Sequence, residues 1–252
     1  MARLDASGSA AGGISVGGRG VVVDRAVVLG FSPKPADAER AVAEMRRIGL
    51  EPEVFWNICG TFQKFIPASM VTGSFLLSPA NMSCYLGHYH IVKSALDRGF
   101  SSLCVVEDDC RFLKDVGLLH DILAKAPADA DYLILGGVPT PESVASMPLS
   151  GGAWRQVRRS LDVRSAVCDI LLSRRAMEMR VKQLDGSLLG GKLPLAGDVG
   201  RDEDTLAGLH VYMAWTPVAI QAVDIAPGRA SAEGIYHRNM YARYDIDIAN
   251  YA

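Results

Sequence analysis

The stretch SSLCVVEDDCRF, residues 101 to 112, places an apolar strand pattern directly before three carboxylates. The run that ends in Val105 and Val106 is typical of a buried strand, and Glu107, Asp108 and Asp109 follow at once. Adjacent like charges repel one another, and their burial is costly unless a positive charge compensates. A divalent cation, which prefers oxygen ligands, would compensate them, whereas the alternative is an acidic turn fully in water.

Strand and helix patterns alternate on both sides of this stretch. Strand patterns cover residues 21–29, 49–56, 131–137 and 211–221, and helix patterns cover 38–48, 81–98, 116–125 and 173–184. Gly49 and Gly99 stand where the first two helices should stop. The order strand, helix, strand predicts an α/β domain, and ligands of such sheets bind outside the carboxyl ends of the strands. The acidic triplet is therefore expected in a functional place.

Composition excludes several classes of function for these 252 residues. The formal net charge of −2 gives no global reason to expect nucleic-acid binding. No apolar run approaches the ~20 residues needed to span a bilayer. The five cysteines are scattered without a CxxC pair, which argues against a disulfide framework or a zinc ribbon, and Cys84 and Cys104 are predicted to be small core residues.

Residues 1–20, rich in Gly, Ala and Ser, are predicted to be a flexible lead segment, followed by a single domain over residues 21–252. The lead segment has no compact apolar centre of the kind that a secretory signal carries, so a cytoplasmic location is expected.

The longer segment NMSCYLGHYHIVKSALDRGFSSLCVVEDDCRF, residues 81 to 112, resembles the family 25 glycosyltransferases. That family includes bacterial lipooligosaccharide galactosyltransferases and the collagen galactosyltransferases. It typically has a Cys, a Ser-His pair, a helix and then an apolar strand that ends in Glu-Asp-Asp; Cys84, His88 and Glu107-Asp108-Asp109 match in order and spacing. The likeness extends in order over roughly residues 25 to 222, including VRSAVCDILLSRRAMEM, where the family has a strand before a Ser-capped helix.

The resemblance implies a type A glycosyltransferase fold, which is a Rossmann-like nucleotide-binding sheet with helices on both faces. It also implies transfer of a hexose, with galactose as the first candidate, to a cell-surface glycan such as lipopolysaccharide. Asp109 is the first candidate ligand for Mn²⁺ or Mg²⁺, and Glu107 is the second, because alternate side chains of an extended segment face one way. Asp108 would then point elsewhere, toward the ribose or sugar hydroxyls of the donor. His88 would bind the donor phosphate or sugar, or would be an ordinary histidine bonded to backbone.

Two further groups of residues could serve the acceptor. Asp202 and Asp204 are candidates for the general base that takes the proton of an acceptor hydroxyl, although acids in a first helical turn also serve as caps. Arg158 and Arg159, in the run WRQVRRSLDVR, could bind an anionic acceptor, although such a run is usually a solvated face. Trp154 could stack on a sugar ring or simply pack.

The expected partners are a nucleotide-sugar donor, with UDP-sugars favoured, and a glycan or glycolipid acceptor. No nucleic acid is expected, and contact with a membrane would be peripheral, at its inner face. Two other functions remain open. A nucleotidyltransferase would normally carry a Gly-rich, basic phosphate loop near its first strand. The second alternative function is a catalytically silent sugar-nucleotide or glycan-binding module. It stays open because Gly87 stands where the family usually has Ser, and Asn81 stands nearest to the place where the family usually has Glu.

Overall fold

A computed structural model describes most of the chain. The described residues are 21–31, 35–57, 79–139, 141, 147–150, 152–158, 163–164, 168–189, 208–221 and 239–251. The predicted lead segment, residues 1–20, lies outside them.

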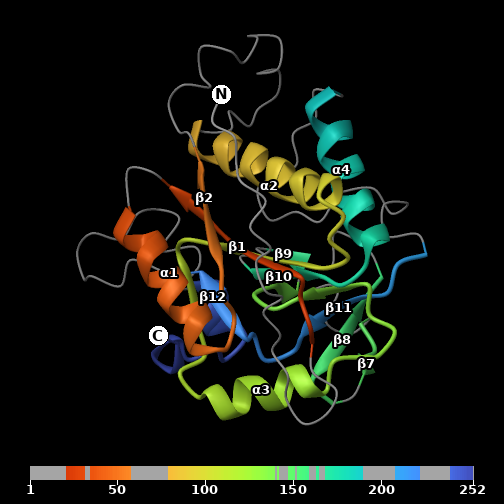
Figure 1. Cartoon of the computed structure of the whole chain (residues 1–252). Coiled ribbons are helices and arrows are strands. Elements are labelled where there is room, and N and C mark those ends of the chain that lie inside the picture. The colour runs from red at the N-terminus through yellow and green to blue at the C-terminus, as the bar shows by residue number, and fades with distance from the viewer. Residues whose placement is uncertain are drawn as a thin grey trace.

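The described elements alternate between helices and strands along much of the chain (Figure 1). The helices are α1 (Pro35–Arg47), α2 (Pro79–Asp97), α3 (Val116–Ala124) and α4 (Arg174–Leu189), with a short 3₁₀ turn at Ile248–Asn250. The strands of the first half are β1 (Arg25–Phe31), β2 (Glu53–Asn57), β3 (Leu103–Glu107), β4 (Cys110–Phe112), β5 (Tyr132–Ile134) and β6 (Val138–Pro139). The remaining strands are β7 (Leu149–Ser150), β8 (Trp154–Val157), β9 (Val163–Arg164), β10 (Cys168–Leu171), β11 (Val211–Ala214) and β12 (Ala219–Gln221).

In the described part of the chain, eight strands form one mixed sheet in the order β2-β1-β3-β10-β5-β11-β8-β7. β1 is parallel to β2 and to β3, and β5 is parallel to β11. β10 lies between these two groups and is antiparallel to both β3 and β5. It follows that β1, β2, β3, β5 and β11 all run in one direction, so their carboxyl ends share one edge of the sheet. β12 pairs with β4, and β6 with β9, in two small separate sheets.

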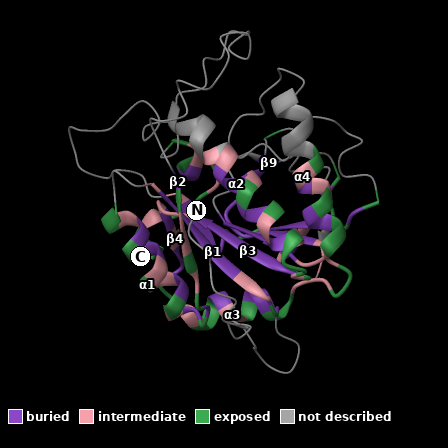
Figure 2. Cartoon of the chain, turned by 45° about the horizontal axis from the view of Figure 1, so that its top comes forward, coloured by how far each residue is buried: buried purple, intermediate pink, exposed green. Residues whose placement is uncertain are grey.

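The helices cover both faces of the sheet. Residues of α1 and α3 pack in one core cluster, and residues of α2 and α4 pack in a second. Figure 2 shows the central strands as buried and the outward faces of the helices as exposed. This arrangement confirms the predicted α/β class with helices on both faces. None of the helices among the described residues has the length and the apolar character needed to cross a bilayer.

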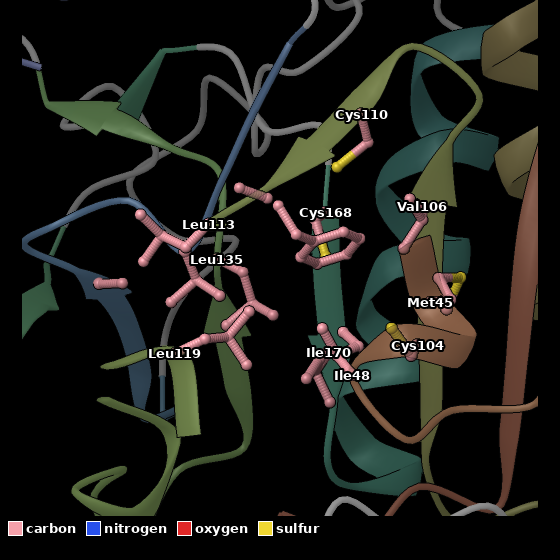
Figure 3. Packing of buried hydrophobic residues seen from close by; sticks show 14 of the residues in the cluster. Met45, Ile48, Cys104, Val106, Cys110, Leu113, Leu119, Leu135, Cys168 and Ile170 are labelled. Atoms are coloured by element: carbon pink, nitrogen blue, oxygen red, sulfur yellow. The ribbon is translucent and has the colours of Figure 1, made fainter. Parts of the chain in front are cut away.

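Side-chain alternation along the strands divides the two cores. On β3, Cys104 and Val106 belong to the cluster on the α1 side, whereas Leu103 and Val105 belong to the cluster on the α2 side. Figure 3 shows Met45 near Cys104 and Val106 in the first cluster. The same alternation directs Glu107, which comes two residues after Val105, toward α2.

Most predicted elements are present, and one predicted strand is wrong in its extent. The pattern VYMAWTPVAIQ is not a single strand over residues 211–221, because it divides into β11 in the main sheet and β12 beside β4. Pro217 lies between the two parts and cannot donate a hydrogen bond to a ladder. The helix stops at Gly49 and Gly99 are confirmed, since both glycines have positive φ values, of 91° and 80°.

Candidate functional site

The carboxyl ends of β1 and β3 lie side by side, because the strands are parallel and Leu29 pairs with Glu107. Two hydrogen bonds fasten the acidic triplet to the end of β1. The backbone N–H of Asp108 donates to the carbonyl of Leu29 at 3.2 Å, and Oδ2 of Asp108 accepts from the backbone N–H of Phe31 at 2.7 Å. Asp108 therefore holds the two strand ends together. The sequence predicted a contact of Asp108 with the donor and did not predict this structural role.

Glu107 points toward α2, where two side chains one helical turn apart meet it. Its Oε1 lies 3.2 Å from Nε2 of His88 and 3.3 Å from Sγ of Cys84. The side chains of His88 and Glu107 are only 11% and 17% exposed. Burial and then the Glu107 carboxylate raise the pKa of the Cys84 thiol well above its usual value. Cys84 is thus a neutral thiol in the free protein and donates to Glu107.

Asp109 turns away to a different partner. Its Oδ2 accepts a hydrogen bond of 2.8 Å from the side-chain amide of Gln221 in β12. Its Oδ1 is buried and has no hydrogen-bond partner among the described residues. Burial, and next the charge of Glu107, raise the pKa of Asp109 from 3.8 to about 7, against the opposing bond from Gln221. A buried carboxylate oxygen without a partner, close to a second carboxylate, would be stabilised by a cation.

The donor atoms of Cys84, His88 and Glu107 all lie within 4.8 Å of one another. The sequence predicted Cys84 to be a core residue, so this grouping was missed, although the spacing of four residues between Cys84 and His88 placed both on one helix face. His90, two residues after His88, is exposed.

A buried ionic group that was not predicted from the sequence lies on the same face of the sheet. Asp169 of β10 and Arg180 of α4 are 5% and 9% exposed. Burial raises the pKa of Asp169, while the electrostatic interactions with Arg180 and then with His88 act in the opposite direction. His88 thus contacts Glu107 and also interacts electrostatically with Asp169. An acid inside the apolar strand CDIL was the only signal of this group in the sequence.

Arg158, which the structure describes, does not lie at this site. Val157 at the end of β8 pairs with Val211 at the start of β11, so Arg158 follows at the sheet edge opposite to Glu107. Trp154 is fully buried and its indole N–H donates to the carbonyl of Ile122 at 2.9 Å, which supports packing over sugar stacking. Arg159, Asp202 and Asp204 lie outside the described residues.

A close approach of α2 to β1 explains the glycine before His88. A Cβ atom added at Gly87 would lie 2.5 Å from Cδ1 of Leu29, which is itself buried. The serine usual in the resembling family would need Leu29 to move. Glycine at this position thus fits the packing here.

Substitution of Gly87 by serine is expected to lower the free energy of unfolding by about 1–3 kcal/mol, the usual cost of overpacking a core. Urea unfolding of Gly87→Ser measures this loss. The double variant Gly87→Ser/Leu29→Val, which shortens the clashing side chain, should recover part of the loss. Equal stability of Gly87→Ser and the wild type would contradict the packing argument.

Comparison with known proteins gives a distant likeness of fold. No family model matches the chain, and no curated protein matches it. A solved structure described as a mannose-1-phosphate geranyltransferase from Thermus thermophilus is 13% identical, covers 79% of this chain and 74% of its own, and has a TM-score of 0.41. The apo form of mouse xyloside xylosyltransferase 1 is 11% identical, covers 72% of this chain and 79% of its own, and has a TM-score of 0.34. Both of these proteins are described as transferases, and the substrates in their descriptions are said of those two proteins alone.

Proposed function

We propose that this chain is a metal-dependent glycosyltransferase of the family 25 type. It would move a hexose, with galactose the first candidate, from a UDP-sugar or related donor to a glycan or glycolipid such as lipopolysaccharide. The observation that carries the proposal is the buried Oδ1 of Asp109, which has no hydrogen-bond partner in the described part of the chain and lies near Glu107, at the edge where β1 and β3 end. That edge is the ordinary ligand-binding edge of an open α/β sheet.

Asp109 and Glu107 would bind a hard cation such as Mn²⁺ or Mg²⁺, because both supply carboxylate oxygens and Oδ1 of Asp109 has no hydrogen-bond partner among the residues that the structure describes. When bound, the cation would offset the charge that builds on the diphosphate leaving group. Asp108 keeps the triplet in register with β1 through its bond to Phe31. His88, hydrogen-bonded to Glu107, would bind a donor oxygen through its remaining ring nitrogen.

The acceptor side of the proposal rests on the sequence. Asp202 or Asp204 would accept the proton of the acceptor hydroxyl as the new glycosidic bond forms. Arg158, at the opposite edge of the sheet, could contact only a distant part of a long anionic acceptor, and Arg159 is its sequence neighbour.

Mn²⁺ is expected to strengthen the binding of a UDP-sugar by about tenfold or more, because metal and diphosphate complete each other's coordination. Calorimetric titration of the donor in Mn²⁺ and in EDTA measures the difference. Asp109→Asn should lose this metal dependence. Equal donor affinity with Mn²⁺ and with EDTA in the wild type would show that the metal proposal is wrong.

The product distinguishes the three functions. Release of UDP with a new glycosidic bond supports the glycosyltransferase, and formation of a nucleotide sugar from a sugar phosphate supports a nucleotidyltransferase. Metal-dependent donor binding without any turnover supports a silent binding module.

A further inference from the structure

We propose that Cys84, His88 and Glu107 form a binding site for a borderline-soft divalent cation, and that Zn²⁺ fits this donor set best. The three side chains supply one sulfur, one nitrogen and one oxygen, with all three atoms within 4.8 Å of one another. Cysteine sulfur, histidine nitrogen and glutamate oxygen are each ligands that zinc takes in proteins. The site goes beyond the proposed function, because it needs neither donor nor turnover.

One helix and one strand carry the three donor atoms. Cys84 and His88 lie one turn apart on α2, and Glu107 is the last residue of β3. Gly87 allows α2 to lie against Leu29 of β1, the strand next to β3. The site is therefore formed where a helix and a strand end are already packed together.

Two of the three separations between the donor atoms are close to those of a zinc site. Zinc bonds of about 2.0–2.3 Å at tetrahedral angles give donor atoms about 3.3–3.5 Å apart. The Cys84 sulfur and the His88 Nε2 lie 3.3 Å and 3.2 Å from the same Glu107 oxygen. The third separation, between the Cys84 sulfur and the ring nitrogen of His88, is within 4.8 Å. Three protein ligands would leave a fourth position for water or another ligand.

The donor set also selects among metals. Thiolate and imidazole favour Zn²⁺ over Mg²⁺ and Mn²⁺, whereas the carboxylates of Glu107 and Asp109 favour the harder ions. Binding at Cys84 would convert its thiol to a thiolate and release that proton to the solvent. Because Glu107 belongs to both donor sets, Zn²⁺ at Cys84 and His88 would compete for Glu107 with a hard cation at Asp109. Zn²⁺ is therefore expected to inhibit Mn²⁺-dependent transfer.

The test titrates the full chain with Zn²⁺ alone, by calorimetry in buffers of different ionisation enthalpy. The wild type should bind Zn²⁺ with release of about one proton from Cys84. Cys84→Ser should weaken Zn²⁺ binding by more than about a hundredfold. Loss of a residue that only hydrogen-bonds a metal ligand costs at most about that much, so a larger loss indicates a direct ligand. His90→Gln is the matched control, because His90 is exposed on the same helix, and it should bind Zn²⁺ like the wild type.

Cobalt gives a readout that does not depend on any variant folding. Co²⁺ bound by the wild type should show thiolate-to-metal charge-transfer absorption, and Cys84→Ser should not. Absence of that absorption in the wild type, or equal Zn²⁺ binding by Cys84→Ser and the wild type, would overturn the proposal. The three residues would then be a hydrogen-bonded group that does not bind metal.

Asp109→Asn separates this proposal from the proposed function. It should keep Zn²⁺ binding while it loses Mn²⁺-dependent donor binding. A wild type that binds Zn²⁺ but never transfers a sugar would sink the glycosyltransferase and leave the zinc site standing. Sugar transfer that needs Mn²⁺ and is not inhibited by Zn²⁺ would support the glycosyltransferase and contradict the zinc site.

Discussion

Replacement of Asp109 by asparagine is expected to lower metal-dependent transfer by at least about a hundredfold, or ~3 kcal/mol of transition-state stabilisation. Asparagine keeps nearly the same shape and can still accept the bond that Gln221 donates to Oδ2. It removes the charge that would hold a cation beside the leaving diphosphate. Turnover of the variant and of the wild type, each with saturating donor and Mn²⁺, measures the loss.

The same substitution should make the fold more stable at neutral pH. The pKa of Asp109 rises from 3.8 to about 7 in the folded chain, so between these values the folded state holds a proton that the unfolded state has released. The free energy of unfolding therefore falls as pH rises through this window. Each unit of pKa corresponds to about 1.4 kcal/mol, and Asp109→Asn should gain on the order of 1 kcal/mol or more at about pH 8. Urea unfolding at about pH 4 and about pH 8 should show a gain only at the higher pH.

Asp108→Asn is the matched control for Asp109→Asn. Its amide oxygen can still accept the 2.7 Å bond from Phe31, so the strand ends should stay together. It should change metal affinity much less than Asp109→Asn does. Full transfer activity in Asp109→Asn would end the glycosyltransferase proposal in its present form. If the triplet were only a solvated acidic turn, both variants would leave activity and stability nearly unchanged.

Local patterns were sufficient to predict most elements and the position of the acidic triplet. The spacing of Ala38, Ala41 and Met45 predicted a helix, and all three are fully buried in α1. The apolar run before Glu107 predicted β3, and the rule for parallel strands placed the triplet at the edge where ligands bind. Such features depend on residues that are close in sequence, which is why they can be read directly.

Features that depend on distant partners could not be predicted in this way. Alternation suggested that Glu107 and Asp109 face one way, but a turn separates them, and their partners are His88 and Gln221. The antiparallel place of β10 between β3 and β5 is fixed by pairing across the sheet, and no local pattern encodes it. Cys84 looked like a core residue because nothing in its own helix shows that Glu107 lies opposite.

The buried charges of Asp169 and Arg180 lead to the second large effect. Arg180→Met is expected to lower the free energy of unfolding by about 3–5 kcal/mol, because it leaves a buried carboxylate without its nearby guanidinium. Methionine keeps much of the apolar volume of the arginine, so lost packing contributes less than lost charge. Urea unfolding at neutral pH measures the change.

Two further variants test whether charge is the cause. Arg180→Met/Asp169→Asn removes both charges and should recover most of the loss, since the penalty belongs to the unpaired carboxylate. Arg174→Met on the same helix breaks an exposed ion pair with Glu178 and an exposed hydrogen bond of 3.4 Å to the carbonyl of Leu96, and should change stability by less than about 0.5 kcal/mol. The loss in Arg180→Met should also shrink as pH falls, because protonation of Asp169 removes the uncompensated charge. A loss that is independent of pH and not recovered by Asp169→Asn would instead assign the effect to packing of the Arg180 stem.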